Sequence, residues 1–453
     1  MTLEKASLKL LQEALERLEI GFQGLPEVEH TTNLDALRIV LLEVAERMHD
    51  NYPYHHPLYI GQMLKPPTEI ARLAYMLSLW INPNNHALDG GKASSAMEKE
   101  AVAEIAKMFG WNTHVGHLCS GGTIANLEGL WVARTLVPNK KIAASNHSHY
   151  THQRICGVLN IPFQPIPCDS RSRLDVGSLK KILEEEDIGT VVVTIGTTAT
   201  GAIDPLPDIL ELQSEYRFRI HVDAAYGGYF TLVDNLDAET RTVFDCLKEV
   251  DSLVVDPHKH GLQPYGCGCI LFKDSSVARI YKHDSPYTYF SSDELHLGEI
   301  SLECSRAGAS AVALWATQRL LPLTPKGKFA TDLSKARKAA LLLFERIQKD
   351  PRFIVAFAPE LDIVIWAPKA KNASEISLLS KEIFKESAVK NLHLAMAELP
   401  RELFADTKQE INWDVNYVTC LRSCLMKPEH LDWIDRIWST LDLVTNKVLN
   451  NSI

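Results

Sequence analysis

Short apolar runs alternate with amphipathic helical patterns through the middle of the chain, and this succession constrains the fold more than any other feature. Within the runs, polar and apolar residues do not alternate, which is typical of strands covered on both faces in a parallel sheet. The runs lie at residues 115–119, 141–145, 191–195, 218–222, 253–256 and 269–272. Helical patterns separate most of them, at 123–136, 149–159, 176–186, 205–216 and 239–248. We therefore predict an α/β fold with a mostly parallel sheet and helices on both faces.

Further patterns flank this central region. Two amphipathic helical patterns precede it, and another helix is expected over about 68–81. Ser95-x-x-Glu98 has the form of a capping box that opens a helix running to about Phe109. A smaller α+β unit with long helices follows residue 325 or so. The expected organisation is an N-terminal helical segment, a large α/β domain and a small C-terminal domain, over residues 1–65, 66–325 and 326–453.

The net charge and the cysteine content limit which classes of partner the protein can bind and in which cellular compartment it is expected. A formal net charge of -10 does not favour binding to nucleic acid or to anionic membranes. No apolar stretch has the length of a membrane helix, and the first residues lack the layout of a secretion signal. The nine cysteines are odd in number and scattered, which is typical of reduced thiols. We expect a cytoplasmic protein whose partner is a small molecule, with no nucleic acid and no membrane.

Polar and small residues follow five of the apolar runs directly. These segments are 120–123, 146–149, 196–198, 223–225 and 257–259. Open α/β sheets bind their ligands at the carboxyl ends of the strands. Because those ends meet at one edge of a sheet, we expect the five loops to converge on one ligand site.

Three of these positions suit particular chemistry. Gly122 and Thr123 offer N–H groups and a hydroxyl to a phosphate, although both residue types are also ordinary at helix starts. Asp223 ends an apolar strand, so its carboxylate is either a backbone cap or the partner of a protonated heterocyclic nitrogen. Lys259 lies between two histidines past a buried strand and is a candidate Schiff-base amine. Its alternative role is an ion pair with an acid such as Asp256.

Three histidines, His147, His149 and His152, raise the question of a metal site. On a helix start they do not fall on one face, and no carboxylate or cysteine lies close in sequence. We therefore expect no metal at this cluster.

Together these motifs resemble the group II pyridoxal-phosphate (PLP) dependent decarboxylases, the aromatic-amino-acid and glutamate type. The similarity runs from about residue 50 to 320 and is strongest in HVDAAYGG (221–228) and DPHK (256–259). SGGTIAN (120–126), GTTATG (196–201) and Ser305-Arg306-x-Gly308 also match. The resemblance implies the PLP-dependent transferase fold type I, with a seven-stranded sheet and a smaller C-terminal domain, and it implies PLP as the cofactor.

The resemblance also assigns roles around the cofactor ring. Lys259 would form the Schiff base, and Asp223 would pair with the pyridine nitrogen. His149 would stack on one face of the ring, and Ala225 would pack against the other. Thr198 would lie beside the ring substituents. Lys259, Asp223 and His149 are the expected catalytic residues.

Other matched positions concern the phosphate and the substrate. Gly122 and Thr123 would hold the phosphate, with His258 nearby. Arg306 matches an arginine that meets the substrate carboxylate in several family members. Tyr59 belongs to a stretch that looks like the family's substrate-pocket opening.

The reaction implied by the resemblance is loss of the α-carboxylate of an L-amino acid as CO2, through the Lys259 Schiff base and a quinonoid intermediate, to give the amine. Tyr287 or Tyr289 would reprotonate the α-carbon. Where aromatic decarboxylases place apolar residues from the partner subunit, residues 82–86 are polar, which favours a more polar substrate. His86 is the candidate substrate contact in this segment.

Other functions stay open. The same framework supports C–C bond cleavage of the sphingosine-phosphate-lyase type, and decarboxylation with oxidative deamination to an aldehyde. A metal hydrolase at the histidine cluster, or a binding protein without catalysis, would be a different class. By analogy with fold type I, we expect a homodimer with active sites at the subunit interface and the two N-terminal helices as a clasp.

Overall fold

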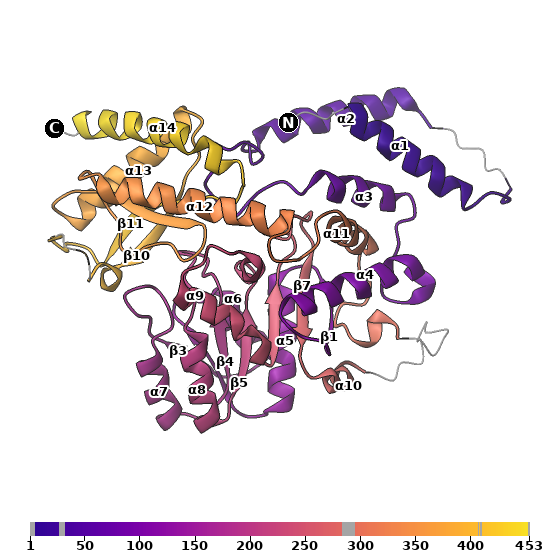
Figure 1. Ribbon diagram of the computed structural model, residues 1–453, viewed down its shortest axis with the longest axis horizontal. Coiled ribbons are helices and arrows are strands. Elements are labelled where there is room, and N and C mark those ends of the chain that lie inside the picture. Colours follow the sequence, from indigo (N-terminus) through magenta and orange to yellow (C-terminus); the bar gives the residue numbers. More distant parts are fainter. Residues whose placement is uncertain (1–4, 27–31, 283–294, 406, 408–409, 452–453) are drawn as a thin grey trace.

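The computed structural model describes residues 5–26, 32–282, 295–405, 407 and 410–451 (Figure 1). It confirms the predicted α/β fold: a seven-stranded sheet carries helices on both faces, and a four-stranded sheet forms a smaller C-terminal unit. In the described part of the chain, no helix is both long and apolar enough to cross a membrane. The expected domain boundaries near residues 65 and 326 stay a prediction.

The large sheet has the strand order β1-β7-β6-β5-β4-β2-β3. The strands are β1 Val115–Cys119, β2 Lys141–Ser145, β3 Phe163–Ile166, β4 Ile188–Thr194, β5 Arg219–Asp223, β6 Ser252–Val255 and β7 Gly268–Phe272. Only β7 runs antiparallel to its neighbours, β1 and β6; the other pairs are parallel. The sequence pattern did not predict β3, because this strand lies at the sheet edge, is largely part-exposed and contains a proline.

Both faces of this sheet are buried, as the non-alternating apolar runs predict. Val191 and Val193 of β4 belong to the main core cluster, whereas Val192 between them packs into a different one with residues of α5 and α6. The helices of this region are α5 Gly122–Leu136, α6 Thr151–Val158, α7 Val176–Glu185, α8 Leu206–Tyr216 and α9 Ala238–Asp245. Two of them start at aspartate caps: Asp175 accepts from the N–H of Ser178, and Asp237 accepts from the N–H of Thr240.

The predicted capping box at Ser95 and Glu98 is wrong. Helix α4 spans Leu88–Met108 with a kink at Gly91, so both residues lie within its second part; both are buried, and the Ser95 hydroxyl makes no capping hydrogen bond among the described residues. Glu98 instead accepts a hydrogen bond from the N–H of Leu118 at 2.9 Å. A carboxylate three residues after a serine has the local pattern of a cap, but here the carboxylate serves a tertiary contact.

The C-terminal unit contains an antiparallel sheet in the order β10-β11-β9-β8. Its elements are α12 Lys328–Lys349, β8 Phe353–Ile354, β9 Ile363–Pro368, α13 Ala373–Val389, β10 Ala395–Pro400, β11 Tyr417–Cys424 and α14 His430–Asn451. Figure 1 shows this unit beside the large sheet, with α12 running along the boundary.

The N-terminal helices α1 Lys5–Ile20 and α2 Leu34–Arg47 lie together at the edge of the molecule (Figure 1), where α1 contacts the rest of the chain through α3. Helix α2 has no buried residue, although most of its side chains are apolar. Helix α3 Glu69–Leu79 follows and packs on α11 Gly308–Leu320, which also packs on α4.

Candidate active site

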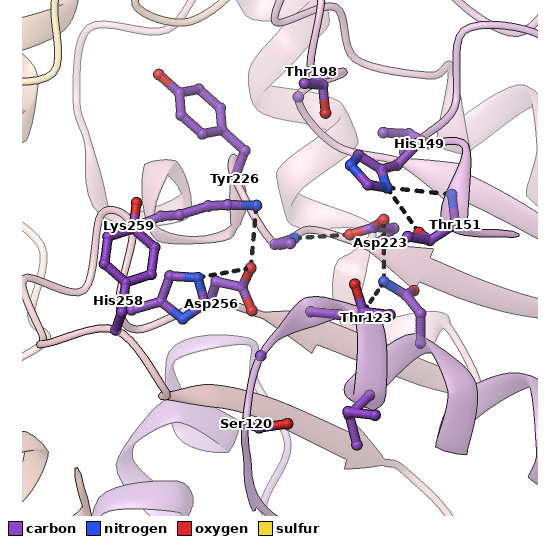
Figure 2. A pocket seen from close by; sticks show the side chains of 18 residues that line it. Ser120, Thr123, His149, Thr151, Thr198, Asp223, Tyr226, Asp256, His258 and Lys259 are labelled. Atoms are coloured by element: carbon purple, nitrogen blue, oxygen red, sulfur yellow. Dashed lines mark hydrogen bonds and ion pairs between the residues drawn. The ribbon is translucent and has the colours of Figure 1, made fainter. Parts of the chain in front are cut away.

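A cavity of about 360 Å³ opens at the carboxyl ends of β1, β4, β5 and β6. All five loops that the sequence places on one rim contribute to its lining, including the loop after β2 (Figure 2). The polar strand ends therefore meet in space, as the parallel-sheet pattern predicts.

The structure brings the predicted cofactor residues together at this cavity. All eight line it: Gly122, Thr123, His149, Thr198, Asp223, Ala225, His258 and Lys259. The three predicted substrate residues, Arg306, Tyr59 and His86, do not line it.

Asp223 ends β5 with its side chain almost completely buried. Its Oδ2 atom lies 3.0 Å from Nε2 of the fully buried His152 and accepts a hydrogen bond from Asn126 at 3.3 Å. Its Oδ1 atom accepts from the N–H of Ala225. Burial alone would raise the pKa of Asp223, but the contact with His152 and the charge of Lys259 outweigh it and hold that pKa below its usual range. The carboxylate is therefore ionised inside the protein.

A buried chain of side chains supports this carboxylate from behind. Asn126 of α5, which donates to Asp223, has its amide oxygen 2.9 Å from Nε2 of His221. Nδ1 of His221 in turn lies 2.8 Å from Oγ of Ser252 on β6. Gly129 leaves the space for the His221 ring, because a Cβ there would lie 2.2 Å from Cε1 of that ring. Helix α5 and two strands thus fix the orientation of Asp223.

Lys259 follows β6 and extends into the cavity (Figure 2). Its Nζ atom lies 3.1 Å from Oδ2 of Asp256, the acid that sequence reasoning gave as the alternative partner. The same oxygen lies 3.5 Å from Nε2 of His258, whose Nδ1 donates to the carbonyl oxygen of Cys267 at 2.8 Å. Burial lowers the pKa of His258. The side chain of Lys259 is 23% exposed, so its amine is both held by a carboxylate and accessible from the cavity.

The start of α5 forms another wall of the cavity. Gly121 precedes this helix with φ 156° and ψ 178°, a conformation that essentially only glycine adopts. Gly122, the next residue, lies so close to Asp256 that a Cβ at this position would be 2.8 Å from Oδ2 of that carboxylate. No side chain caps this helix start, so its first N–H groups are available to an anion.

His149 lies in the loop after β2, on the Asp223 side of the cavity in Figure 2. Its Nδ1 atom is 2.8 Å from Oγ1 of Thr151, which fixes the ring orientation. Burial lowers the pKa of His149, so the ring is neutral near pH 7.

The histidine cluster is not gathered around one point. His147 contacts Ser172 and His149 contacts Thr151, whereas His152 faces Asp223. Within the described ranges, no group of three His, Cys, Asp or Glu side chains is placed to hold a metal ion.

Arg306 has a different position from the one that the resemblance implies. Its guanidinium is buried, and Nη1 donates to Oε1 of Glu98 at 2.6 Å and to the carbonyl oxygen of Leu118. This ion pair ties the segment before α11 to α4 and β1. The positive charge is neutralised by a buried carboxylate and is not presented to the cavity.

Tyr59, His86 and the polar segment 82–86 also lie away from the cavity. Tyr59 is buried, and its ring packs edge-on against Tyr54 at 4.9 Å. His86 is part-buried, and its carbonyl oxygen accepts from the N–H of Gly298. Asn85 is fully buried and donates to Glu98 at 2.6 Å. The polarity of this segment thus has a structural role within the chain, which removes the argument for a polar substrate.

Sequence reasoning missed several residues of the site. Asn126 and Tyr226 lay inside the matched motifs and could have been identified there, whereas Tyr265 carried no distinguishing pattern. Asp256 was expected only as an ion-pair partner of Lys259, and His152 only as a member of the histidine cluster. The predicted proton donors Tyr287 and Tyr289 lie outside the described residues.

Arg422 of β11 was missed as well. It is 4% exposed, and only its Nη1 has a hydrogen-bond partner in the described chain, Gln62 at 3.2 Å. Arg422 does not line the cavity itself; burial raises the pKa of Tyr226, which does line it, and the charge of Arg422 acts on that pKa in the opposite direction.

Comparison with known proteins agrees with this geometry. Residues 48–369 match the model of the pyridoxal-dependent decarboxylase conserved domain. L-tyrosine decarboxylase of Enterococcus faecium is 27% identical, over 78% of this chain and 76% of its own. Probable L-tyrosine/L-aspartate decarboxylase of Methanothermobacter thermautotrophicus is 28% identical, over 83% and 95%. The crystal structure of Oryza sativa TDC with PLP and tryptamine has a similar fold, with a TM-score of 0.79, 16% identity and 99% of each chain covered.

Proposed function

This chain belongs to the pyridoxal-dependent decarboxylase family, and on that premise we propose that it removes the α-carboxylate of an L-amino acid as CO2, with Lys259 as the residue that binds the cofactor covalently. The main support for the proposal is the arrangement of one cavity. The ionised, buried carboxylate of Asp223, the accessible amine of Lys259 and the uncapped start of α5 all face this cavity.

The donors of this cavity fit pyridoxal phosphate. The N–H groups at the start of α5 and the hydroxyl of Thr123 would hold the phosphate. Asp223 would accept a hydrogen bond from the protonated pyridine nitrogen, and Lys259 would bind the aldehyde carbon. His149 and Ala225 would contact the ring, with Thr198 at its substituents and His258 near the phosphate.

The bound cofactor supplies an electron sink for the bonding electrons that CO2 leaves behind. The protein's part is electrostatic and positional. Burial raises the pKa of Asp223, but the contact with His152 outweighs this effect and keeps the carboxylate ionised, which favours a proton on the pyridine nitrogen. Asp256 orients the Lys259 amine, and the Cys267 carbonyl fixes the His258 ring beside it.

For the substrate carboxylate we propose Arg422 in place of Arg306. Arg306 already pairs with Glu98, whereas Nε and Nη2 of Arg422 have no hydrogen-bond partner among the described residues. A buried guanidinium with free N–H groups costs free energy until an anion binds it.

The experiment combines product analysis with labelling. Purified enzyme with PLP is given tyrosine, aspartate, glutamate and tryptophan, and CO2, amine, aldehyde and peroxide are measured. We expect CO2 and amine in equal amounts. A product that keeps the α-carboxylate would disprove decarboxylation, and peroxide with aldehyde would indicate the oxidative alternative.

Borohydride reduction then tests the covalent site. The label is expected on Lys259, found by peptide mapping, and the Lys259→Ala variant should neither take up label nor turn over. Lys273→Ala is the control, because Lys273 is a half-exposed lysine after β7 that pairs with Glu249 away from the cavity. Normal turnover by Lys259→Ala would refute the assignment.

We also propose a homodimer. The supporting observation is helix α2, whose apolar side chains Leu37, Val40, Leu41 and Val44 are about half exposed or more. Single exposed apolar residues are ordinary, but a helix without any buried residue gains little from folding on its own chain. A second subunit packed on α2 would cover this surface.

The cytoplasmic location stays our proposal. All nine cysteines are free thiols in the structure, most of them buried, which suits a reducing compartment.

A further inference from the structure

A second cavity, of about 570 Å³, lies apart from the first and shares no lining residue with it. It opens between the segment before α3, the start of α12 and the loop between β11 and α14. Its charged or titratable lining residues are His55, Lys65, Glu69, His260, Lys328, Asp332, Lys427 and Glu429. Apolar residues cover the rest, among them Leu262, Phe329, Leu333 and Met426.

Two of its lysines have only neutral partners. Lys427 is 5% exposed; its Nζ donates to the carbonyl oxygen of Tyr59 at 2.8 Å and lies 5.4 Å from the centre of the Tyr59 ring. Lys65 is part-buried, and its Nζ donates to the carbonyl oxygen of Met426 at 3.2 Å. Neither amine forms an ion pair within the described part of the chain.

The acids that line the cavity form no ion pair with either amine. Asp332 pairs with Lys328 at 2.5 Å, and Glu69 accepts a hydrogen bond from Ser7. Glu429 is exposed to solvent. The second cavity therefore combines an apolar wall with two amines that form no ion pair in the described chain. The charges of Asp362, Glu429 and Asp332 favour a protonated Lys65, and that of Glu429 favours a protonated Lys427, but burial outweighs them.

The two amines are in an unfavourable environment when charged. Burial lowers the pKa of Lys65 to about 8. Burial, followed by the repulsion of Lys65, lowers the pKa of Lys427 to about 7. An anion between them would favour both charges, because an opposite charge nearby stabilises the protonated amine.

We propose that this second cavity is a binding site for a small organic anion, whose acidic group lies between Lys65 and Lys427 and whose apolar part packs against Leu262, Phe329 and Leu333. A carboxylate or a phosphate group meets this requirement, whereas a neutral molecule of the same shape leaves the two charges uncompensated.

The test is calorimetric titration of the PLP-loaded enzyme with benzoate, whose charge does not change between pH 6 and 9. Lys427→Met and Lys65→Met should each weaken binding by roughly tenfold or more, since each removes a desolvated charge partner. Lys328→Met is the matched control: it removes a lysine from the same cavity, but one already paired with Asp332, and should bind as wild type. The visible absorbance of the bound cofactor reports that each variant is folded.

Binding should also weaken as the pH rises from 6.5 to 8.5, because the amines lose their protons over this range. Of the other lining groups, His55 and His260 have their pKa lowered by burial, so both rings are largely neutral from pH 6.5 upward. Benzyl alcohol, the neutral analogue, should not bind. Equal affinity in Lys427→Met and Lys328→Met, equal binding of benzyl alcohol, or no binding by the wild type would overturn the proposal.

Discussion

Oδ2 of Asp223 lies 3.0 Å from Nε2 of His152, a contact that joins the end of β5 to helix α6 inside the protein. Both side chains are almost completely buried, so water screens the charge of the Asp223 carboxylate only weakly. The sequence alone indicates His152 only as a member of a histidine cluster. Its position shows that it serves the carboxylate at the centre of the candidate site.

Replacing Asp223 by asparagine should weaken cofactor retention and slow turnover together. The amide keeps the shape but loses the charge that favours a protonated pyridine nitrogen. We expect turnover to fall roughly a hundredfold or more, the scale for losing one preorganised electrostatic contact at an active site. Cofactor absorbance after dialysis and kcat are the two measurements. Asp245→Asn changes the same charge on an exposed part of α9 and should leave both unchanged.

Gly129→Ala should damage the site from a distance. The new Cβ would meet the His221 ring, which holds Asn126 and through it Asp223. Overpacking of this kind costs about 1–3 kcal/mol of stability, and cofactor affinity should fall as well. Gly157→Ala is the matched control, since its Cβ meets nothing within 4 Å. An alanine in helix α6 should stabilise by about 0.5–1 kcal/mol. Urea unfolding measures the stability of the two variants, and cofactor titration measures their affinity for PLP. Identical results for the two variants would contradict the proposed role of His221 and Asn126 in holding Asp223.

Arg306→Met separates a structural role from substrate binding. Removing the guanidinium leaves Glu98 buried without its counter-ion, which should cost about 3–5 kcal/mol of stability. Adding Glu98→Gln should restore part of this loss. If Arg306 met the substrate carboxylate instead, the single variant would raise KM with an unchanged Tm. Thermal unfolding and steady-state kinetics on the single and double variants distinguish the two roles.

The depressed pKa of Lys427 predicts a pH dependence of stability. This pKa is about 7 in the folded protein against an ordinary 10.5, so between these values the unfolded chain binds more protons. The stability contribution of Lys427 therefore rises with pH across this window. In Lys427→Met the contribution vanishes, so the wild type should gain on the order of 1–2 kcal/mol relative to the variant between pH 7 and 9. Urea unfolding at both pH values measures the difference; a difference of opposite sign would be inconsistent with the buried amine.

The double substitution Leu37→Asp and Leu41→Asp should weaken subunit association. Both side chains are exposed on α2, and charges there would have to be desolvated in an interface. Analytical ultracentrifugation should show a dimer for the wild type and a shift toward monomer for the variant. Leu378→Asp, on an equally exposed leucine of α13, is the control and should remain dimeric. A wild-type protein that is monomeric and fully active would contradict the proposal that the two N-terminal helices hold a dimer together.

Local sequence patterns were sufficient for most of the sheet and for its ligand-binding edge. The apolar runs of β4, β5 and β6 were recognisable because both faces of these strands are buried. The motifs after these strands could be placed at one edge because parallel strands end together. β3 and β10 were not predicted, since their side chains are largely part-exposed or exposed and their apolar pattern is weak.

Motifs of residues close together along the chain were enough to predict the α/β fold, the family, and the placement of Asp223 and Lys259 at strand ends. Which charges meet across long separations became known from the three-dimensional arrangement. It paired Asp223 with His152 and Arg306 with Glu98, and it left Lys65 and Lys427 without carboxylate partners in the described chain. An ion pair forms only between groups that the fold brings close together in space. Local sequence patterns do not show which groups, far apart along the chain, become neighbours.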